Sequence, residues 1–353
     1  MKEAGEACAY AVEMRPEDLT AYVELVHIDY IWQKYEEGIA EVEQLAANIG
    51  NLTGEEAAQW ATLQFLAGEC CMELEQFGKA ADYYKQAIEF EPSEGEYYTR
   101  CAIALARAGE KDGAEDFLEG ALQKGISDES LYLTKAEIML SQKKYQDAEA
   151  LISKVLEMTS DSDLSYHAYL TAARIYEEAA GAIDDAREKE RELLEKAVGR
   201  LESGYALSLS EKLGDTYYEL AGQQKNTKQS MEYYEKALSC FNDIYKKGYQ
   251  SFHVMQNMAV INQTLGNYEE AEEVLLDMID IYPEDYRGYM YLTLLYTEIQ
   301  NRISIEKRDY SAIFEYYDRA EKLYQREVNS GAVMDANMQI LDSLIADLRK
   351  LED

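Results

Sequence analysis

The chain has 353 residues and a formal net charge of −35, because 69 Asp and Glu outnumber 34 Lys and Arg. Nucleic acids and anionic lipid surfaces both bind basic protein faces, so the charge argues against both as partners. No apolar run of about 18 residues occurs, and the N-terminal sequence lacks a long apolar core. We therefore expect neither a membrane-spanning helix nor a signal peptide, and partners that are neutral or basic.

The first expected element is a helix over residues 1–16, which ends at a proline. The same spacing of small and bulky residues occurs again before each of the other two prolines of the chain. The three segments are Ala4-Cys8-Ala11-Pro16, Ala80-Tyr84-Ala87-Pro92 and Ala271-Leu275-Met278-Pro283. Each segment begins with a small residue, continues with further core-type residues at helical spacing, and ends at a residue that stops a helix. The pattern predicts that all three are the same helix of a repeated unit.

The small residue that opens this pattern recurs along the chain. It is found at Ala4, Gly38, Ala80, Ala114, Ala148, Ala237 and Ala271, with Ile313 as a weaker last member. Most neighbouring positions are 34 residues apart, two spacings are 42, and the 89 residues from Ala148 to Ala237 leave room for two units with insertions. A 34-residue period is typical of a repeated helix–turn–helix unit. The extra residues of the longer units amount to about two helical turns, which longer helices can absorb.

A second pattern precedes these helices and predicts the first helix of each unit. Its matches are Tyr98-Cys101-Ala102-Leu105, Tyr132-Lys135-Ala136-Met139, Tyr169-Ala172-Ala173-Tyr176, Leu213-Gly214-Tyr217 and Ala67-Gly68-Cys71. Small residues let two helices approach closely, and large residues fill the neighbouring gap. In its period and in both patterns the chain resembles the tetratricopeptide repeat family over nearly all of its length.

The resemblance implies an all-α fold, an α-α superhelix (a tetratricopeptide-repeat solenoid) of about eight helical hairpins. We expect a single solenoid over residues 1–353, with a half-repeat at 1–16, regular repeats at 17–160, repeats with insertions at 161–250, repeats at 251–328 and a capping end helix at 331–353. The half-repeat favours a fragment cut from a longer protein, and a natural cap is the alternative.

The first helices of such repeats line a concave face, so the resemblance implies binding residues at fixed positions of those helices. The candidates are Val23, His27, Tyr30, Phe65, Glu69, Met72, Thr99, Ile103, Leu133, Glu137, Leu140, His167, Arg174, Tyr218 and His253. The apolar candidates lie in the N-terminal half, where such a strip would suit an extended peptide or an amphipathic helix. Some repeats of the family bind a terminal carboxylate with Lys and Asn side chains on adjacent first helices. The corresponding positions of this sequence contain neither Lys nor Asn, so this mode of binding is not expected.

The sequence shows no catalytic motif, no cofactor signature and no metal-ligand spacing. Its three histidines, His27, His167 and His253, have no His or Cys three or four residues on. We therefore predict that the chain is not an enzyme and binds neither a metal nor a cofactor. The five cysteines are odd in number and lack C-x-x-C spacing, so reduced, structural thiols are expected. Free thiols favour a cytoplasmic location, and an extracytoplasmic part of a membrane-anchored protein is the alternative.

These observations favour a protein-interaction scaffold whose concave face binds a peptide or protein segment. A second hypothesis is a sensor or docking region of a larger bacterial signalling protein. Residues 308–320, with Met338 and Leu341, resemble the C-terminal repeat region of bacterial membrane-anchored serine/threonine kinases, which implies a kinase domain upstream. A third hypothesis is a peptide-sensing regulator. A further hypothesis is that copies of the chain stack on one another through exposed repeat ends.

Overall fold

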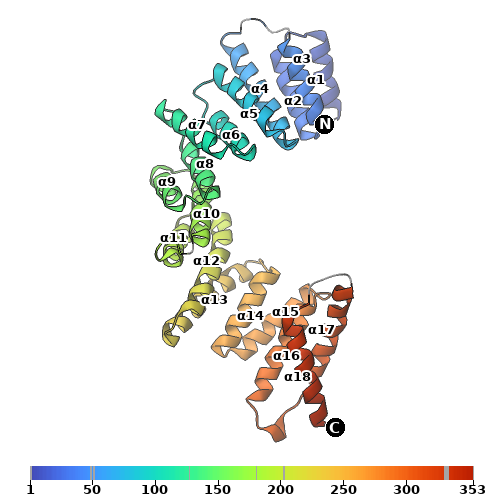
Figure 1. Cartoon of the computed structure of the whole chain (residues 1–353). Helices are drawn as coiled ribbons and strands as arrows, with labels where there is room; N and C mark the ends of the chain where they lie inside the picture. The colour runs from blue at the N-terminus through green and yellow to red at the C-terminus, as the bar shows by residue number, and fades with distance from the viewer. Residues whose placement is uncertain are drawn as a thin grey trace. The chain divides into compact units, whose positions relative to one another are not determined.

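The computed structural model describes residues 2–47, 50, 52–126, 128–179, 181–201, 203–329 and 334–352, with the side chains of 2–4, 203, 351 and 352 excepted. These residues form helices and no β-strand (Figure 1). The α-helices in chain order are α1 (Lys2–Met14), α2 (Leu19–Ile31), α3 (Tyr35–Ala46), α4 (Glu55–Glu73), α5 (Phe77–Phe90), α6 (Gly95–Arg107), α7 (Lys111–Gln123), α8 (Glu129–Ser141), α9 (Tyr145–Met158), α10 (Ser162–Glu178), α11 (Ala186–Arg200), α12 (Ser203–Gln223), α13 (Thr227–Lys246), α14 (Phe252–Leu265), α15 (Tyr268–Ile281), α16 (Tyr286–Asn301), α17 (Ser311–Asn329) and α18 (Ala336–Glu352). A short 3₁₀ helix, Ile305–Lys307, precedes α17.

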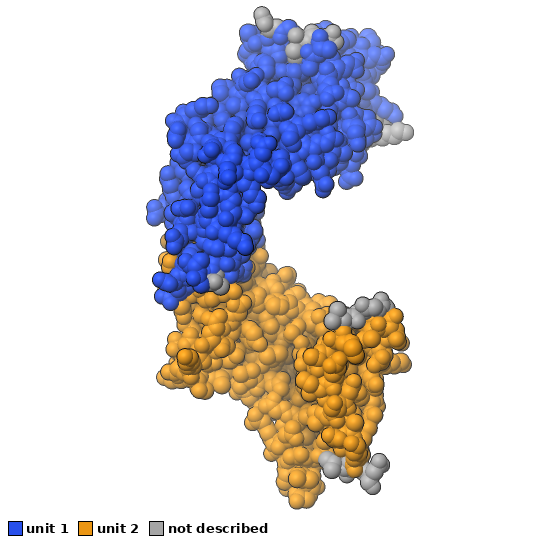
Figure 2. Space-filling model, viewed as in Figure 1, with its two compact units in different colours: residues 1–186 blue, residues 187–353 orange. Residues whose placement is uncertain are grey.

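The chain divides into two compact units, residues 1–186 and 187–353, and each is described by itself (Figure 2). In the first unit α2 packs on α3 and α4, α6 on α7 and α8, and α8 on α9 and α10. In the second unit α12 through α17 pack in succession, and α18 packs on α17. The predicted fold class is confirmed as an all-α repeat fold, with a leading helix, hairpins and an end helix. The continuous solenoid over the whole chain stays a prediction.

Several first helices are capped by side chains, and the turns to the second helices are closed by backbone hydrogen bonds. Asp18, Asp128, Asp161, Ser251 and Asp285 each accept a hydrogen bond from a backbone N–H in the first turn of the helix that follows. This interaction satisfies donors that a helix start leaves without partners. Within the hairpins, Lys34, Gln76, Glu110, Lys144 and Asn267 each donate a backbone N–H to the carbonyl five residues earlier, at 2.8–2.9 Å. The same turn thus joins α2 to α3, α4 to α5, α6 to α7, α8 to α9 and α14 to α15.

The longer unit between Gly38 and Ala80 lengthens a helix, as its spacing predicts. The α4 helix has 19 residues, whereas α2, α6 and α8 have 13 each. The second unit contains three further long helices, α12 with 21 residues, α13 with 20 and α17 with 19. Added helical turns preserve the backbone hydrogen bonds of a helix, so these insertions leave the hairpin pattern in place.

Small residues of the first helices meet aromatic rings of the second helices in the core. A Cβ atom on Gly68 would lie 2.6 Å from Cε1 of Tyr84, and one on Gly214 would lie 2.8 Å from Cε1 of Phe241. Tyr84 and Phe241 are both fully buried. Both glycines belong to the first-helix pattern of the sequence. Their missing side chains therefore set the separation of α4 from α5 and of α12 from α13.

Tyrosine hydroxyls donate hydrogen bonds to carboxylates on neighbouring helices in both units. The pairs are Tyr83–Glu43, Tyr84–Glu69, Tyr176–Glu149, Tyr217–Glu195, Tyr233–Glu188, Tyr245–Asp277, Tyr268–Glu298, Tyr296–Glu272 and Tyr317–Asp342. Each bond gives a half-buried hydroxyl a charged acceptor, which is among the stronger kinds of hydrogen bond. Part of the acidic composition therefore serves to join helices.

Substitution of Gly68 tests the close contact with Tyr84. Gly68→Ala places a methyl group 2.6 Å from a buried ring, so the free energy of unfolding should fall by about 1–3 kcal/mol. The matched control is Gly78→Ala on α5, where the new Cβ meets no atom within 4 Å. Alanine favours a helix over glycine there, so Gly78→Ala should raise stability by up to about 1 kcal/mol. Urea unfolding followed by circular dichroism measures both, and equal effects of the two substitutions would contradict this packing.

Buried thiols and phenols should make the fold sensitive to alkali. Burial raises the pKa of the Cys70 and Cys101 thiols from 9.0 to about 12, and burial is also the main cause that raises the pKa of Tyr97 from 10.0 to about 12. As the pH rises, the unfolded chain loses these protons first, so it binds fewer protons than the folded chain and is favoured. These groups contribute fully to the free energy of unfolding below about pH 9, and their contribution is lost progressively as the pH rises toward 12.

The urea midpoint should therefore decrease as the pH rises from about 9 toward about 12. Cys101→Ala removes one of these groups and should show a smaller decrease than the unsubstituted chain. A midpoint that stays constant over this range would be incompatible with protonated, buried thiols.

Candidate functional site

First helices of neighbouring hairpins in residues 1–186 are joined by polar and aromatic contacts. Gln59 Nε2 of α4 donates to Thr20 Oγ1 of α2 at 2.8 Å. Arg100 Nε of α6 lies 3.5 Å from Glu69 Oε1 of α4, and the same carboxyl oxygen accepts the Tyr84 hydroxyl at 2.5 Å. Side chains of α2, α4 and α6 therefore form a continuous surface, and we call the surface formed by the first helices α2, α4, α6, α8 and α10 the first-helix face.

The predicted binding residues differ in how much surface they present. The exposed ones are His27, Glu137, His167, Arg174 and His253. The half-buried ones are Val23, Tyr30, Phe65, Glu69, Met72, Ile103 and Tyr218. Thr99, Leu133 and Leu140 are buried, with 8%, 8% and 2% of their surface exposed. These three contribute to the core of their hairpins and present little surface to a ligand.

A pocket opens on the first-helix face between α6 and α8, with α7 at its rim. Its volume is about 280 Å³, and it is lined by Ile103, Ala106, Arg107, Lys111, Thr134, Glu137, Ile138 and Ser141. Ile103 and Glu137 are two of the residues that the sequence predicted. Lys111 Nζ donates to the carbonyl of Ser141 at 3.1 Å, so its charge lies at the edge of the pocket. The pocket is an apolar recess with charged groups around it.

Glu137 links this pocket to the next first helix. Its Oε1 accepts a hydrogen bond from Thr171 Oγ1 of α10 at 3.2 Å. The carboxyl group reaches solvent, yet the surrounding protein raises its pKa, and the Thr171 hydrogen bond and the charges of Arg174 and His167 oppose that rise. Three of the predicted residues, Glu137, His167 and Arg174, therefore share one electrostatic environment.

A separate polar cluster lies on the first helices of residues 187–353. His253 Nε2 of α14 lies 2.8 Å from Asp215 Oδ1 of α12, and Asn257 Nδ2 donates to the same oxygen at 3.0 Å. Burial raises the pKa of Asp215, and the His253 charge and hydrogen bond oppose the rise. Tyr218, one turn further along α12, packs edge-on against Tyr234 with ring centroids 5.7 Å apart. The cluster can accept or donate hydrogen bonds to a peptide backbone.

Sequence reasoning missed several residues that shape these sites. Arg107, Lys111, Thr134 and Ile138 line the α6–α8 pocket, and Asn257 completes the His253 cluster. Thr134 lies three residues before Glu137 on α8 and so shares a face with that predicted residue, and Ile138 lies four residues after Thr134. The 34-residue register places each residue on its own helix, but it gives no information about which side chains of the next helix it meets.

Within the described ranges, no group of three or more His, Cys, Asp or Glu residues is placed to hold a metal ion. Among the helices of the same residues, none combines the length and the apolar composition needed to cross a membrane. Cys70, Cys71 and Cys101 are buried free thiols, and Cys8 and Cys240 are partly buried.

Models of the tetratricopeptide repeat match residues 55–129 and residues 252–285. The first segment covers α4 to α7 and the second covers α14 and α15, so matching repeats occur in both compact units. The helical-repeat architecture and these matches define a helical-repeat protein, and this fold supports a role as a scaffold for protein–protein interaction. In particular, residues 55–129 and 252–285 are similar to tetratricopeptide repeats.

Several solved structures are similar to this chain. The C-terminal part of a TPR repeat-containing protein from Cytophaga hutchinsonii is similar with a TM-score of 0.51 and 16% identity, over 73% of this chain and 94% of that chain. A tetratricopeptide repeat protein from Parabacteroides merdae gives a TM-score of 0.46 and 16% identity, over 73% and 91%. YrrB, described as a TPR protein with an unusual peptide-binding site, gives 0.38 and 21%, over 58% and 98%. The comparison with curated proteins gives no significant match. The relation to kinase repeat regions stays a prediction.

Proposed function

We propose that the first-helix face of residues 1–186 binds a peptide segment of a partner protein and that the α6–α8 pocket receives one apolar side chain of that segment. The observation that carries the proposal is the pocket itself, because Ile103, Ala106 and Ile138 supply an apolar recess on the predicted binding face. Apolar pockets with a few fixed polar groups at the rim are typical of peptide recognition. The function is binding without catalysis.

The proposed segment lies across α4, α6, α8 and α10 in an extended or helical conformation. Half-buried Phe65 and Met72 on α4 offer apolar contact on one side of the pocket. Glu137, with Arg174 nearby on α10, offers polar contact on the other side. The net charge of −35 makes a neutral or basic segment the preferred partner. A preformed surface of this kind loses little conformational entropy on binding, since its side chains are already held by neighbouring helices.

A peptide library selected on the full chain tests the proposal. We expect enriched peptides to share one apolar side chain, and Ile103→Asp to weaken their binding by at least about tenfold, because it puts a charge into the apolar recess. The matched control is Ile281→Asp at the end of α15, where Ile281 is 43% exposed and lies outside this face. Binding constants from calorimetry should be unchanged in that control. The proposal fails when no peptide is enriched, or when the two variants lose affinity equally.

A further inference from the structure

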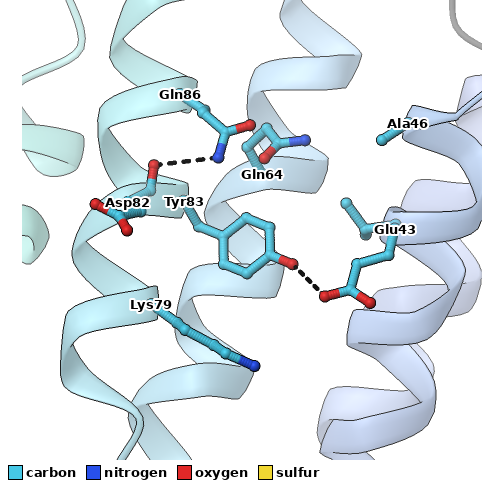
Figure 3. A pocket seen from close by; sticks show the side chains of 8 residues that line it. Glu43, Ala46, Gln64, Lys79, Asp82, Tyr83 and Gln86 are labelled. Carbon is cyan, nitrogen blue, oxygen red and sulfur yellow. Dashed lines mark hydrogen bonds between the residues drawn. The ribbon is translucent and has the colours of Figure 1, made fainter.

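A second pocket lies beside the second helices of the first two hairpins, away from the first-helix face (Figure 3). Its volume is about 380 Å³. It is lined by Val42, Glu43 and Ala46 of α3, Gln64 of α4, and Lys79, Asp82, Tyr83 and Gln86 of α5. We call it the Gln64 pocket. All of its residues belong to the first compact unit, and none of them has a role in the function proposed above.

Gln64 carries an unsatisfied acceptor in this pocket. Its side chain points into the space between Tyr83 and Ala46 (Figure 3). Only 1% of Gln64 is exposed, and its Oε1 accepts no hydrogen bond from the protein. A buried polar atom without a partner destabilises the folded state, and such atoms are rare in native proteins. A bound group that donates a hydrogen bond to Oε1 would remove this cost.

The repeat register explains why the pocket exists. Gln64 precedes Tyr98 by one 34-residue period, and Tyr83 precedes Phe117 by the same period. In the later hairpin the buried Tyr98 ring packs on Phe117 with centroids 5.7 Å apart. In the earlier hairpin an amide takes the place of that ring, and the space against Tyr83 is left open. The group that fits this space is therefore planar, about the size of an aromatic ring, and a hydrogen-bond donor.

We propose that the Gln64 pocket receives an arginine side chain of a partner protein. A guanidinium group is planar, stacks on aromatic faces and presents five N–H donors in a rigid fork. In the pocket it stacks on Tyr83, donates to the Glu43 carboxylate and, after rotation of the Gln64 amide toward the pocket, donates to Gln64 Oε1. Val42 and Ala46 contact its aliphatic part, so planar shape, donor capacity and an apolar stem are all matched by one side chain.

Charge complementarity favours arginine over a neutral ring. Glu43 and Asp82 supply two carboxylates to the lining and Lys79 supplies one cation. Asp82 is paired with Lys85 at 3.6 Å, whereas Glu43 accepts the Tyr83 hydroxyl at 3.2 Å, so the Glu43 carboxylate lies beside the stacking ring. Lys79 opposes a bound cation. The affinity for arginine should therefore fall when Glu43 is neutralised and rise when Lys79 is neutralised.

The experiment is a titration of the full chain with three blocked tripeptides, followed by saturation-transfer NMR. They are Ac-Gly-Arg-Gly-NH₂, the citrulline analogue, which keeps the shape without the charge, and Ac-Gly-Trp-Gly-NH₂, which carries a neutral ring donor. We expect the arginine peptide to bind at least about fivefold more tightly than the other two. Tighter binding of the tryptophan or citrulline peptide would overturn the assignment to arginine.

Four variants locate the binding. Gln64→Tyr restores the residue type of position 98 and fills the pocket, so binding should be lost. Gln64→Leu keeps the space without the acceptor, and Glu43→Gln removes the charge, so each should weaken binding by about threefold or more. Lys79→Gln should strengthen it. Circular dichroism verifies folding, and Gln64→Leu should raise the Tm because it removes an unsatisfied amide. Arginine binding that persists in Gln64→Tyr, or that is unchanged in Glu43→Gln and Lys79→Gln, would refute the proposal.

Discussion

The contact between a small residue on a first helix and a large ring on its second helix is the constraint on which the hairpins depend. At Gly68 and Gly214 the facing rings of Tyr84 and Phe241 lie closer than any Cβ could approach. This contact fixes the distance between paired helices, and the distance in turn fixes which side chains reach the next hairpin. The first-helix face is therefore a consequence of packing inside each hairpin.

Many of the acidic residues have a structural role, because their carboxylates accept hydrogen bonds from tyrosine hydroxyls. Charge alone suggests a solvated, self-repelling surface. In the structure many carboxylates accept hydroxyl donors from the neighbouring helix, as Glu69 does from Tyr84 and Glu149 from Tyr176. A tyrosine at such a position fills the gap between helices with its ring and binds the carboxylate with its hydroxyl. Carboxylates and tyrosines are thus parts of one arrangement that recurs along the chain.

The sequence predicted the helices and their pairing well because those depend on local spacing. The period located the small residues, and the turns between paired helices repeat in the same register. The sequence predicted the exposure of the candidate binding residues less completely. Thr99, Leu133 and Leu140 share positions with half-buried residues of other hairpins but are themselves buried, because burial depends on the neighbouring helix as well as on register. Asp215 contacts His253, 38 residues away in the sequence, and Glu137 contacts Thr171, 34 residues away. No local sequence pattern specifies such partners.

A repeat array offers a simple route to new binding sites. Each hairpin contains the same core positions, so replacement of one ring leaves a cavity whose walls the neighbouring helices already hold in place. Gln64 occupies a position that holds Tyr98 one period later, and the change substitutes a hydrogen-bond acceptor for an aromatic ring. The hairpin tolerates the loss because the Gly68–Tyr84 contact still holds α4 against α5. Departures from the repeat pattern at core positions therefore indicate binding sites more strongly than variation on the exposed face, where substitution costs little.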